Sequence, residues 1–307
     1  MKLHVAIIGT GYGLRVLSNC FKNLKSFDVK YIFSRNKKGL SFTNNINQII
    51  QDKTVNFICI ETPPFTHLKF IKLFIKKKAY ILCEKPIVNN NKDLKNLKKI
   101  LLNNNKILIN HQLRHHPHLK RYKKLITNKQ IKKIKIEYNS NNFIEKKKTW
   151  WTKNNLGGGH LLAIGPHLLD LCNFYFGEIK CLKKKLKYSK INSNKIDTSF
   201  FISGQFKNGV LFQLNSSCRS AKKKPSLKIY SESDNNEYIF DNYKSLKYHK
   251  KKILLRKMKF KDNFYSNPWR EAQNYYLRYL EKNLNNLKQI RNDMKMSFRN
   301  LRFIFST

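Results

Sequence analysis

A glycine-rich turn follows the first apolar run of the chain, Leu3 to Ile8. A tight turn that opens a helix lets backbone N–H groups and the helix dipole meet a pyrophosphate. The usual glycine spacing would place a glycine at position 14, where this chain has Leu. The motif predicts a bound dinucleotide, with a plain tight turn as the alternative. The residues expected to contact it are Gly9, Thr10, Gly11, Tyr12, Gly13 and Leu14.

The second apolar run, Val29 to Phe33, ends without a carboxylate. In dinucleotide-binding sheets an acid about 20 residues after the glycines commonly bonds the ribose hydroxyls of NAD. Ser34 and Arg35 stand at that place here. A hydroxyl and a guanidinium suit a 2′-phosphate, so we expect NADP as cofactor, with NAD possible. The alternative is that Arg35 is a solvated loop charge that stacks on adenine.

Two later apolar runs end in residues that can bind a ligand or react with it. One continues into Glu61-Thr62-Pro63-Pro64-Phe65-Thr66-His67, and the next into Cys83-Glu84-Lys85-Pro86. Ligands of doubly wound sheets bind outside the carboxyl ends of the strands. A lysine locked before a proline at such an end is a poor choice for a solvated charge. We therefore expect Lys85 to point into a cleft.

Short apolar runs and helical spacings alternate over the first part of the chain. The runs are rich in Val, Ile and Phe and apolar on both faces, as parallel strands between helices should be. We expect an N-terminal Rossmann domain, a doubly wound parallel sheet. Its expected strands are 3–8, 29–33, 55–60, 79–83 and 106–109, and its expected helices are 15–23, 44–51, 67–77 and 93–103.

The pattern changes after about Leu119. Helices are expected at 119–126, 160–176, 270–287 and 293–305, and strands at 131–138, 180–187, 199–206, 210–216, 227–231 and 237–240. Asn208-Gly209 indicates a hairpin with a two-residue turn. We expect a C-terminal α+β domain, an open antiparallel sheet covered on one face by helices. At roughly 100–200 residues per domain, the chain divides into residues 1–118 and 119–307.

The charge of the chain is unusual, because 63 Lys and Arg against 18 Asp and Glu give a net charge of +45. Such a charge suggests a nucleic acid or an anionic membrane as partner. However, 52 of these residues are Lys, only 11 are Arg, and the lysine runs are spread over both halves. This favours drift in an AT-rich genome, so we expect no nucleic-acid and no membrane partner. A salt-sensitive complex with duplex DNA would reverse that expectation.

The apolar runs and the cysteines indicate a cytoplasmic protein. No apolar run approaches the ~20 residues of a membrane span, and Gly9 stops the first run too early for a signal peptide. The 6 cysteines lie far apart, which fits neither a zinc framework nor a redox dithiol. The histidine cluster at His115 and His116 has no acidic neighbour in the sequence, so we expect no metal.

A fourth motif, from Gly157 to Asp170, reads GGGHLLAIGPHLLD. With the glycine turn, the Thr62-Pro63 that precedes His67, and Glu84-Lys85-Pro86, the chain resembles the glucose-fructose oxidoreductase and inositol dehydrogenase (Gfo/Idh/MocA) family. The resemblance spans nearly the whole chain. It implies hydride transfer between a nicotinamide cofactor and a hydroxyl or carbonyl carbon of a sugar, sugar derivative or nucleotide-linked sugar.

The resemblance also implies roles for single residues. Lys85 would hydrogen-bond the reacting oxygen, and His167 would exchange its proton. Cofactor contacts are implied for Thr62, Pro63, His67, Glu84 and Lys85, and substrate contacts for Lys85, Arg114, His160 and His167. A solvated loop histidine is the alternative for His160. The family implies a homodimer or homotetramer, and its Glu-Lys-Pro commonly holds a cis peptide bond.

The chain departs from the family pattern four residues before His167, where Ala163 replaces a frequent Asp. An Asp there would lie one helical turn away and steer the imidazole. Ala163 and Leu14 favour a competing hypothesis, a non-catalytic sensor that binds NAD(P) with the same fold. Retention of both Lys85 and His167 favours the enzyme. Pro166 is tolerated only in a first helical turn or at a kink, so we expect His167 at a helix start or break.

Overall fold

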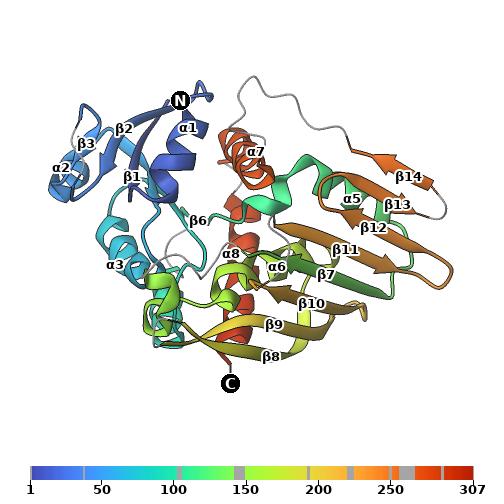
Figure 1. Cartoon of the computed structure of the whole chain (residues 1–307). Helices are drawn as coiled ribbons and strands as arrows, with labels where there is room; N and C mark the ends of the chain where they lie inside the picture. Colours follow the sequence, from blue (N-terminus) through green and yellow to red (C-terminus); the bar gives the residue numbers. More distant parts are fainter. Residues whose placement is uncertain are drawn as a thin grey trace. The chain divides into compact units, whose positions relative to one another are not determined.

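The computed structural model describes residues 2–36, 39–101, 106–141, 149–191, 194–219, 225–248, 251–255, 267–284 and 287–306. Contacts between Cα atoms divide the chain into two compact units. The first unit contains the residues up to Gln112 together with Gln273–Phe305, and the second contains Leu113–Ala272. Figure 1 labels their elements. No helix within the described ranges is long and apolar enough to cross a membrane.

The division differs from the expected one, which assigned both C-terminal helices to the second domain. Helix α7 (Pro268–Asn283) begins in the second unit and continues into the first, and α8 (Leu287–Phe305) packs against β6 and α4. The Tyr276 hydroxyl on α7 donates to the Ile109 carbonyl oxygen at 2.9 Å. The Tyr80 hydroxyl donates to the Leu284 carbonyl oxygen at 3.1 Å. These contacts explain why the end of the chain belongs to the first unit.

The first unit is built on a six-stranded parallel sheet with the strand order β3-β2-β1-β4-β5-β6. This is the order of a Rossmann fold, and it confirms the expected doubly wound sheet. Both faces of β1 and β4 are buried, as their unbroken apolar sequences require. The strands are β1 (Leu3–Ile8), β2 (Phe27–Phe33), β3 (Phe42–Thr43), β4 (Val55–Ile60), β5 (Tyr80–Cys83) and β6 (Ile107–Ile109).

The connecting helices begin where the sequence permits them. Pro64 occupies the first turn of α3, where its missing N–H is not needed, and Asn45 accepts a hydrogen bond from the Asn47 N–H to cap α2. The helices of this unit are η1 (Gly13–Leu17, a π-helix), α1 (Ser18–Phe21), α2 (Ile46–Gln51), α3 (Pro64–Phe74) and α4 (Asn91–Leu101), and η2 (Gln112–His115) follows at the boundary of the two units.

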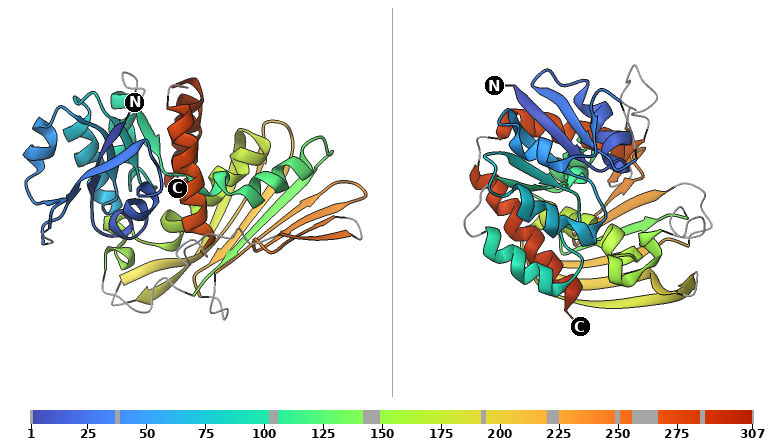
Figure 2. Two further views of the ribbon diagram at one scale, coloured as in Figure 1. Left: turned by 90° about the horizontal axis from the view of Figure 1, so that it is seen from above. Right: turned by 90° about the vertical axis from the view of Figure 1, so that its left-hand side faces the viewer.

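The second unit contains an eight-stranded sheet with the order β14-β13-β12-β11-β7-β10-β9-β8. Its pairs are antiparallel apart from β7 and β10, which run parallel. One face carries α5 and α6, so buried and less buried residues alternate along β7 (Figure 2). The bounds are α5 (Pro117–Ile126), β7 (Lys133–Asn139), η3 (Trp150–Thr152), η4 (Asn154–Leu156), α6 (His160–Phe176), β8 (Ile179–Ile191), β9 (Asn194–Phe206), β10 (Leu211–Ser217), β11 (Ser226–Glu232), β12 (Glu237–Asp241), β13 (Ser245–Tyr248) and β14 (Lys251–Leu254).

Helix α6 is capped from another element. Gly159, its N-cap residue, has no side chain, and the Asp197 carboxylate on β9 instead accepts the Leu161 N–H at 2.6 Å. Gly159 has a φ of 103°, and a Cβ there would collide with this carboxylate. The helix then runs through Pro166 to Phe176 without a break, so His167 lies within it. The expected helix start or break at His167 is wrong.

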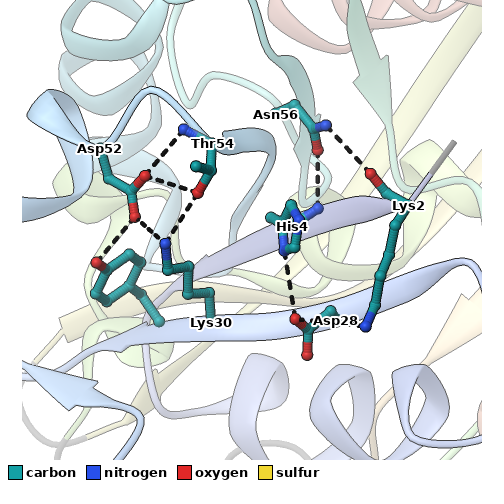
Figure 3. Close-up of polar contacts among 8 residues, drawn as sticks. Lys2, His4, Asp28, Lys30, Asp52, Thr54 and Asn56 are labelled. Carbon is teal, nitrogen blue, oxygen red and sulfur yellow. Dashed lines mark hydrogen bonds and ion pairs between the residues drawn. The ribbon is translucent and has the colours of Figure 1, made fainter.

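Charged side chains occupy the starts of β1, β2 and β4, at the amino edge of the parallel sheet (Figure 3). The Asp52 carboxylate accepts from Lys30 at 2.6 Å, from the Tyr31 hydroxyl at 3.0 Å and from the Thr54 hydroxyl at 2.7 Å. His4 Nδ1 lies 3.3 Å from Asp28 Oδ2. Ligands of such sheets bind at the opposite, carboxyl edge. These contacts therefore hold strands and loops together at the edge away from the candidate site.

Asp52 gives a test of this contribution to stability. Burial by itself raises the pKa of Asp52, but hydrogen bonds from Lys30 and Thr54 outweigh it and lower the pKa below its usual value. A carboxylate with a depressed folded pKa stabilises the protein above the unfolded pKa of about 3.9, and this contribution is lost as the pH falls further. Asp52→Asn should therefore lower the free energy of unfolding near neutral pH, by a difference that shrinks in acid.

Urea unfolding at a series of pH values measures this difference. Asp234→Asn is the control, because it makes the same chemical change at an exposed carboxylate that pairs with Lys132. A loss of stability in Asp52→Asn that does not change with pH would show that the charge of Asp52 is not what stabilises the fold.

Candidate functional site

Five strands of the parallel sheet end in one row. Ile8 pairs with Phe33 and with Ile60, Ile60 pairs with Cys83, and Cys83 pairs with Ile109. The residues that follow these strand ends continue the same row, and their backbone N–H groups donate to the neighbouring strands at 2.9–3.3 Å. The row consists of Ser34, Gly9, Glu61, Glu84 and Asn110. Register alone thus brings five separate motifs to one edge, next to the point where the strand order reverses.

The glycine turn is packed so closely that two of its glycines have no room for a side chain. A Cβ on Gly9, which has a φ of 118°, would lie 2.8 Å from the Glu61 carbonyl oxygen. A Cβ on Gly13 would lie 2.7 Å from Ile7 Cγ2 and 2.9 Å from Glu61 Cβ. Gly13 therefore performs the close helix–strand packing expected of a glycine at position 14. The cradle fits a pyrophosphate that approaches the backbone closely.

A chain of hydrogen bonds links the glycine turn to the end of β5. The Tyr12 hydroxyl donates to Gln273 Oε1 at 3.3 Å, and Asn110 Nδ2 donates to the same oxygen at 2.9 Å. Asn110 Nδ2 also donates to Glu84 Oε1 at 2.5 Å. Gln273 lies on α7 and is fully buried. Helix α7 therefore supplies a residue that hydrogen-bonds the polar side chains at this edge of the sheet.

Lys85 follows this network directly, and its peptide bond to Pro86 is cis. Its backbone N–H donates to Glu84 Oε2 at 3.1 Å. Burial lowers the pKa of Lys85, while Glu84 and Glu61 act in the opposite direction. Burial raises the pKa of Glu61 well above its usual value, and the charge of Glu84 raises it further. The ends of β4 and β5 therefore hold an amine and two carboxyl groups within one partly buried cluster.

His67 lies beneath the same edge and is fully buried. Its Nε2 is 2.7 Å from the Thr62 carbonyl oxygen, and its Nδ1 is 3.0 Å from the Pro86 carbonyl oxygen. Burial lowers the pKa of His67 to about 4, so the ring is neutral near neutral pH. Both nitrogens face backbone carbonyl oxygens, and the neutral ring donates its single N–H to one of them. This argues against the expected direct contact between its ring and the cofactor.

Ser34 and Arg35 follow β2 as expected. Ser34 is buried, and its hydroxyl accepts the Asn36 N–H at 3.3 Å. The Arg35 side chain is exposed. The backbone thus places a hydroxyl next to the glycine turn, while Arg35 is accessible to a charged ligand.

In the second unit, Arg114 forms an ion pair rather than an open anion site. Its Nε donates to Asp170 Oδ2 at 2.8 Å, and Nη2 contacts Asp170 Oδ1. Both side chains are almost completely buried, and Asp170 lies on α6 three residues after His167. Two nitrogens of Arg114 thus bond a carboxylate of the protein itself, which argues against the substrate contact implied for this residue.

His160 begins α6 and is fully buried. Its Nε2 is 2.8 Å from the Ser216 hydroxyl, which itself donates to the Tyr138 carbonyl oxygen at 2.7 Å. Nε2 must therefore carry the proton and donate it. Burial lowers the pKa of His160 to about 4. The alternative that His160 is a solvated loop histidine is therefore wrong. The bond to Ser216 argues against a contact between His160 and the substrate.

His167 lies two turns further along α6 and is almost fully buried. The Trp269 ring meets it edge to face, with centroids 4.8 Å apart, and Tyr138 packs on the same indole at 5.8 Å. The aromatic contacts hold the imidazole where Ala163, one helical turn before, offers no carboxylate. Trp269 thus packs directly against the imidazole of His167.

Sequence reasoning did not name Glu61, Asn110 or Gln273 among the individual site residues. Glu61 and Asn110 each follow an apolar run directly, and that position was the available signal. Gln273 carried none, because it reaches the row from another part of the chain.

Comparisons with known proteins match the architecture. The family model for the oxidoreductase family with an NAD-binding Rossmann fold matches residues 3–112, and the model for the GFO/IDH/MocA C-terminal domain matches residues 121–234. Oxidoreductase P35 of Formosa agariphila is 29% identical over 194 residues, 60% of this chain and 59% of that relative. An uncharacterized oxidoreductase of Synechocystis is 24% identical over 202 residues, 60% of this chain and 54% of that relative. The match thus spans less than two thirds of either relative.

Solved structures share the fold at low sequence identity. Levoglucosan dehydrogenase in complex with NADH and L-sorbose has a TM-score of 0.82 and 14% identity, covering 99% of this chain and 96% of that one. GenD2 from gentamicin A biosynthesis in complex with NAD has a TM-score of 0.79 and 15% identity, and the match covers 98% of this chain and 93% of that one. The two family models together match most of the chain, one over each of its two sheets, so the chain belongs to the Gfo/Idh/MocA oxidoreductase family.

Proposed function

We propose that the protein transfers a hydride between NADP and a hydroxyl or carbonyl carbon of a sugar, sugar derivative or nucleotide-linked sugar. The observation that carries this proposal is the position of Lys85. The lysine follows β5 in a row that also contains the glycine turn, and it lies in a cluster with two carboxyl groups. A cation there can stabilise the oxygen whose charge changes during hydride transfer. The cofactor supplies or accepts the hydride when it is bound.

The row and the residues next to it would each bind a different part of the cofactor. The backbone from Gly9 to Leu14 would hold the pyrophosphate, and Ser34 with Arg35 would hold the 2′-phosphate. Thr62, Pro63 and Glu84 lie toward β4 and β5 and would border the nicotinamide half. NAD is the alternative cofactor. The levoglucosan dehydrogenase structure contains NADH, and the GenD2 structure contains NAD.

Lys85 and His167 would share the work on the substrate oxygen. Lys85 would hydrogen-bond the oxygen, and His167 would take or return its proton, since an imidazole has an ordinary pKa near 6.5. The contacts of Arg114 with Asp170 and of His160 with Ser216 support positioning roles for both residues. In that role they hold α6, and with it His167, in place.

The non-catalytic sensor remains the competing function, and Ala163 is the observation that favours it. Steady-state turnover of sugars and nucleotide-linked sugars separates the two. Tight NADPH binding with no turnover in either wild type or Lys85→Ala would support the sensor. We also propose a cytoplasmic homodimer or homotetramer, and light scattering measures the assembly directly.

Substitution of Lys85 or His167 tests the catalytic roles. Lys85→Met and His167→Ala should each slow the chemical step by ~10² or more, the usual scale for acid–base catalysis. Their combined effect should be less than additive, because both act on one oxygen in one transition state. NADPH affinity should hardly change. Single-turnover absorbance of the nicotinamide measures the step itself.

Lys76→Met is the matched control, because it removes an exposed amine of the same unit. Near-normal turnover in His167→Ala would contradict the proton-transfer role and assign the proton to another group. His116 is then the next candidate, since its Nε2 lies 3.3 Å from Glu271 within the second unit.

Arg35→Ala tests the choice of cofactor. If Arg35 holds a 2′-phosphate, the variant should bind NADPH at least tenfold more weakly, a loss of about 1.4 kcal/mol, and should bind NADH almost unchanged. Fluorescence titration with both cofactors measures the ratio, and Arg302→Ala at an exposed position of α8 is the control. An equal loss for both cofactors would mean that Arg35 only stacks on adenine. A native preference for NADH would refute NADP.

A further inference from the structure

Glu61 and Glu84 are side-by-side carboxyl groups. They follow the paired residues Ile60 and Cys83 on adjacent parallel strands, and the Glu84 N–H donates to the Ile60 carbonyl oxygen at 2.9 Å. Paired residues of such strands lie about 4.8 Å apart and direct their side chains to the same face. The register therefore places two acids next to each other at the edge where Lys85 begins the following loop.

The two acids differ in their surroundings. Glu84 accepts hydrogen bonds from the Asn110 amide at 2.5 Å and from the Lys85 N–H at 3.1 Å. Both carboxyl oxygens of Glu61 are buried, and neither has a hydrogen-bond partner among the described residues. Hydrogen bonds to a carboxylate favour its ionised form, while burial without them favours the protonated form. Hydrogen bonds thus favour the ionised form of Glu84 and oppose the burial that raises its pKa, whereas burial and the charge of Glu84 raise the pKa of Glu61 well above its usual value.

Other ionisable groups near the cluster keep one charge state around neutral pH. Burial raises the pKa of the Tyr12 phenol and of the Cys59 and Cys83 thiols well above their usual values, and it lowers the pKa of His67 to about 4. All four groups are thus neutral. Charge changes within the cluster above neutral pH involve Glu61, Glu84 and Lys85.

We propose that Glu61 is a positioning residue that keeps Lys85 in its ammonium form. When Glu61 is ionised, its carboxylate and that of Glu84 place two negative charges beside one cation. The two charges then favour the ammonium form of Lys85, in a partly buried place that by itself favours the neutral amine. The inference rests on the proposed function for its purpose, because an ammonium group is what stabilises the reacting oxygen. Its electrostatic basis is independent of any substrate.

Nuclear magnetic resonance of the free protein tests the electrostatic part. The Lys85 side-chain signal in protein labelled at lysine is the signal missing from Lys85→Met. In Glu61→Gln the pKa of Lys85 should fall by about one unit or more, because the negative charge of Glu61 no longer favours the ammonium form. Glu61→Asp, which keeps the acid, should titrate nearly as wild type. Glu237→Gln makes the same change at an exposed position and should have no effect.

Turnover provides the second measurement. The alkaline limb of the kcat/KM profile should move to lower pH in Glu61→Gln by the same amount as the Lys85 pKa, with cofactor affinity unchanged. A merely structural role would lower activity at all pH values without moving that limb. An unchanged Lys85 titration in a folded Glu61→Gln protein would overturn the inference. Absence of any turnover would instead contradict the proposed function and leave the resonance result to decide the role of Glu61.

Discussion

The hydrogen-bond register of the parallel sheet is the constraint on which the site depends. Each strand pair from β2 to β6 is aligned so that the residues after Phe33, Ile8, Ile60, Cys83 and Ile109 fall in one row. A shift by one residue would turn each side chain to the other face of the sheet. The apolar strands are buried on both faces, so such a shift would also disrupt the packing of core residues on both sides of the sheet. The same burial that folds the sheet therefore positions the polar edge.

Other parts of the chain satisfy some of the polar groups at this edge, while both carboxyl oxygens of Glu61 have no partner among the described residues. An unpaired buried polar group costs about 1–3 kcal/mol, so the amides of Asn110 and Gln273 matter to the fold as well as to the site. Gln273 arrives on α7, which explains why the C-terminal segment belongs to the first unit. In the second unit the Arg114–Asp170 pair and the His160–Ser216 bond do the same for α6.

Sequence predicted the elements well where the burial pattern is local. The bounds of β1, β4 and α6 agree with the apolar runs and with the helical spacing. Strands β3, β13 and β14 were not expected, because β3 has 2 residues and the other two are short and carry lysines. The expected two-residue turn at Asn208-Gly209 is wrong, because the Phe206 N–H donates to the Val210 carbonyl oxygen and closes a three-residue loop. Only Gly209 has a positive φ in that loop.

The candidate site was predictable where a motif follows a strand and was not where partners come from afar. Lys85 and Glu84 were expected at a strand end, and the structure has them there. The side-chain contacts of His67, His160 and Arg114 are with backbone carbonyls, Ser216 and Asp170 respectively, which the linear sequence does not bring near them. Gln273 is the extreme case, because its partner Asn110 lies 163 residues earlier in the chain.

The most direct test of the account is a crystal structure of the complex with oxidised NADP. The account predicts the pyrophosphate on the backbone of Gly9 to Leu14, the 2′-phosphate at Ser34 and Arg35, and the nicotinamide in contact with Lys85. Hydride transfer requires the substrate carbon and the reactive carbon of the nicotinamide to lie roughly 3–3.5 Å apart. In its proposed role Lys85 hydrogen-bonds the oxygen on that substrate carbon, so it must lie beside the reactive carbon of the ring. A nicotinamide bound away from the strand-end row, with Lys85 contacting neither cofactor nor substrate, would contradict it.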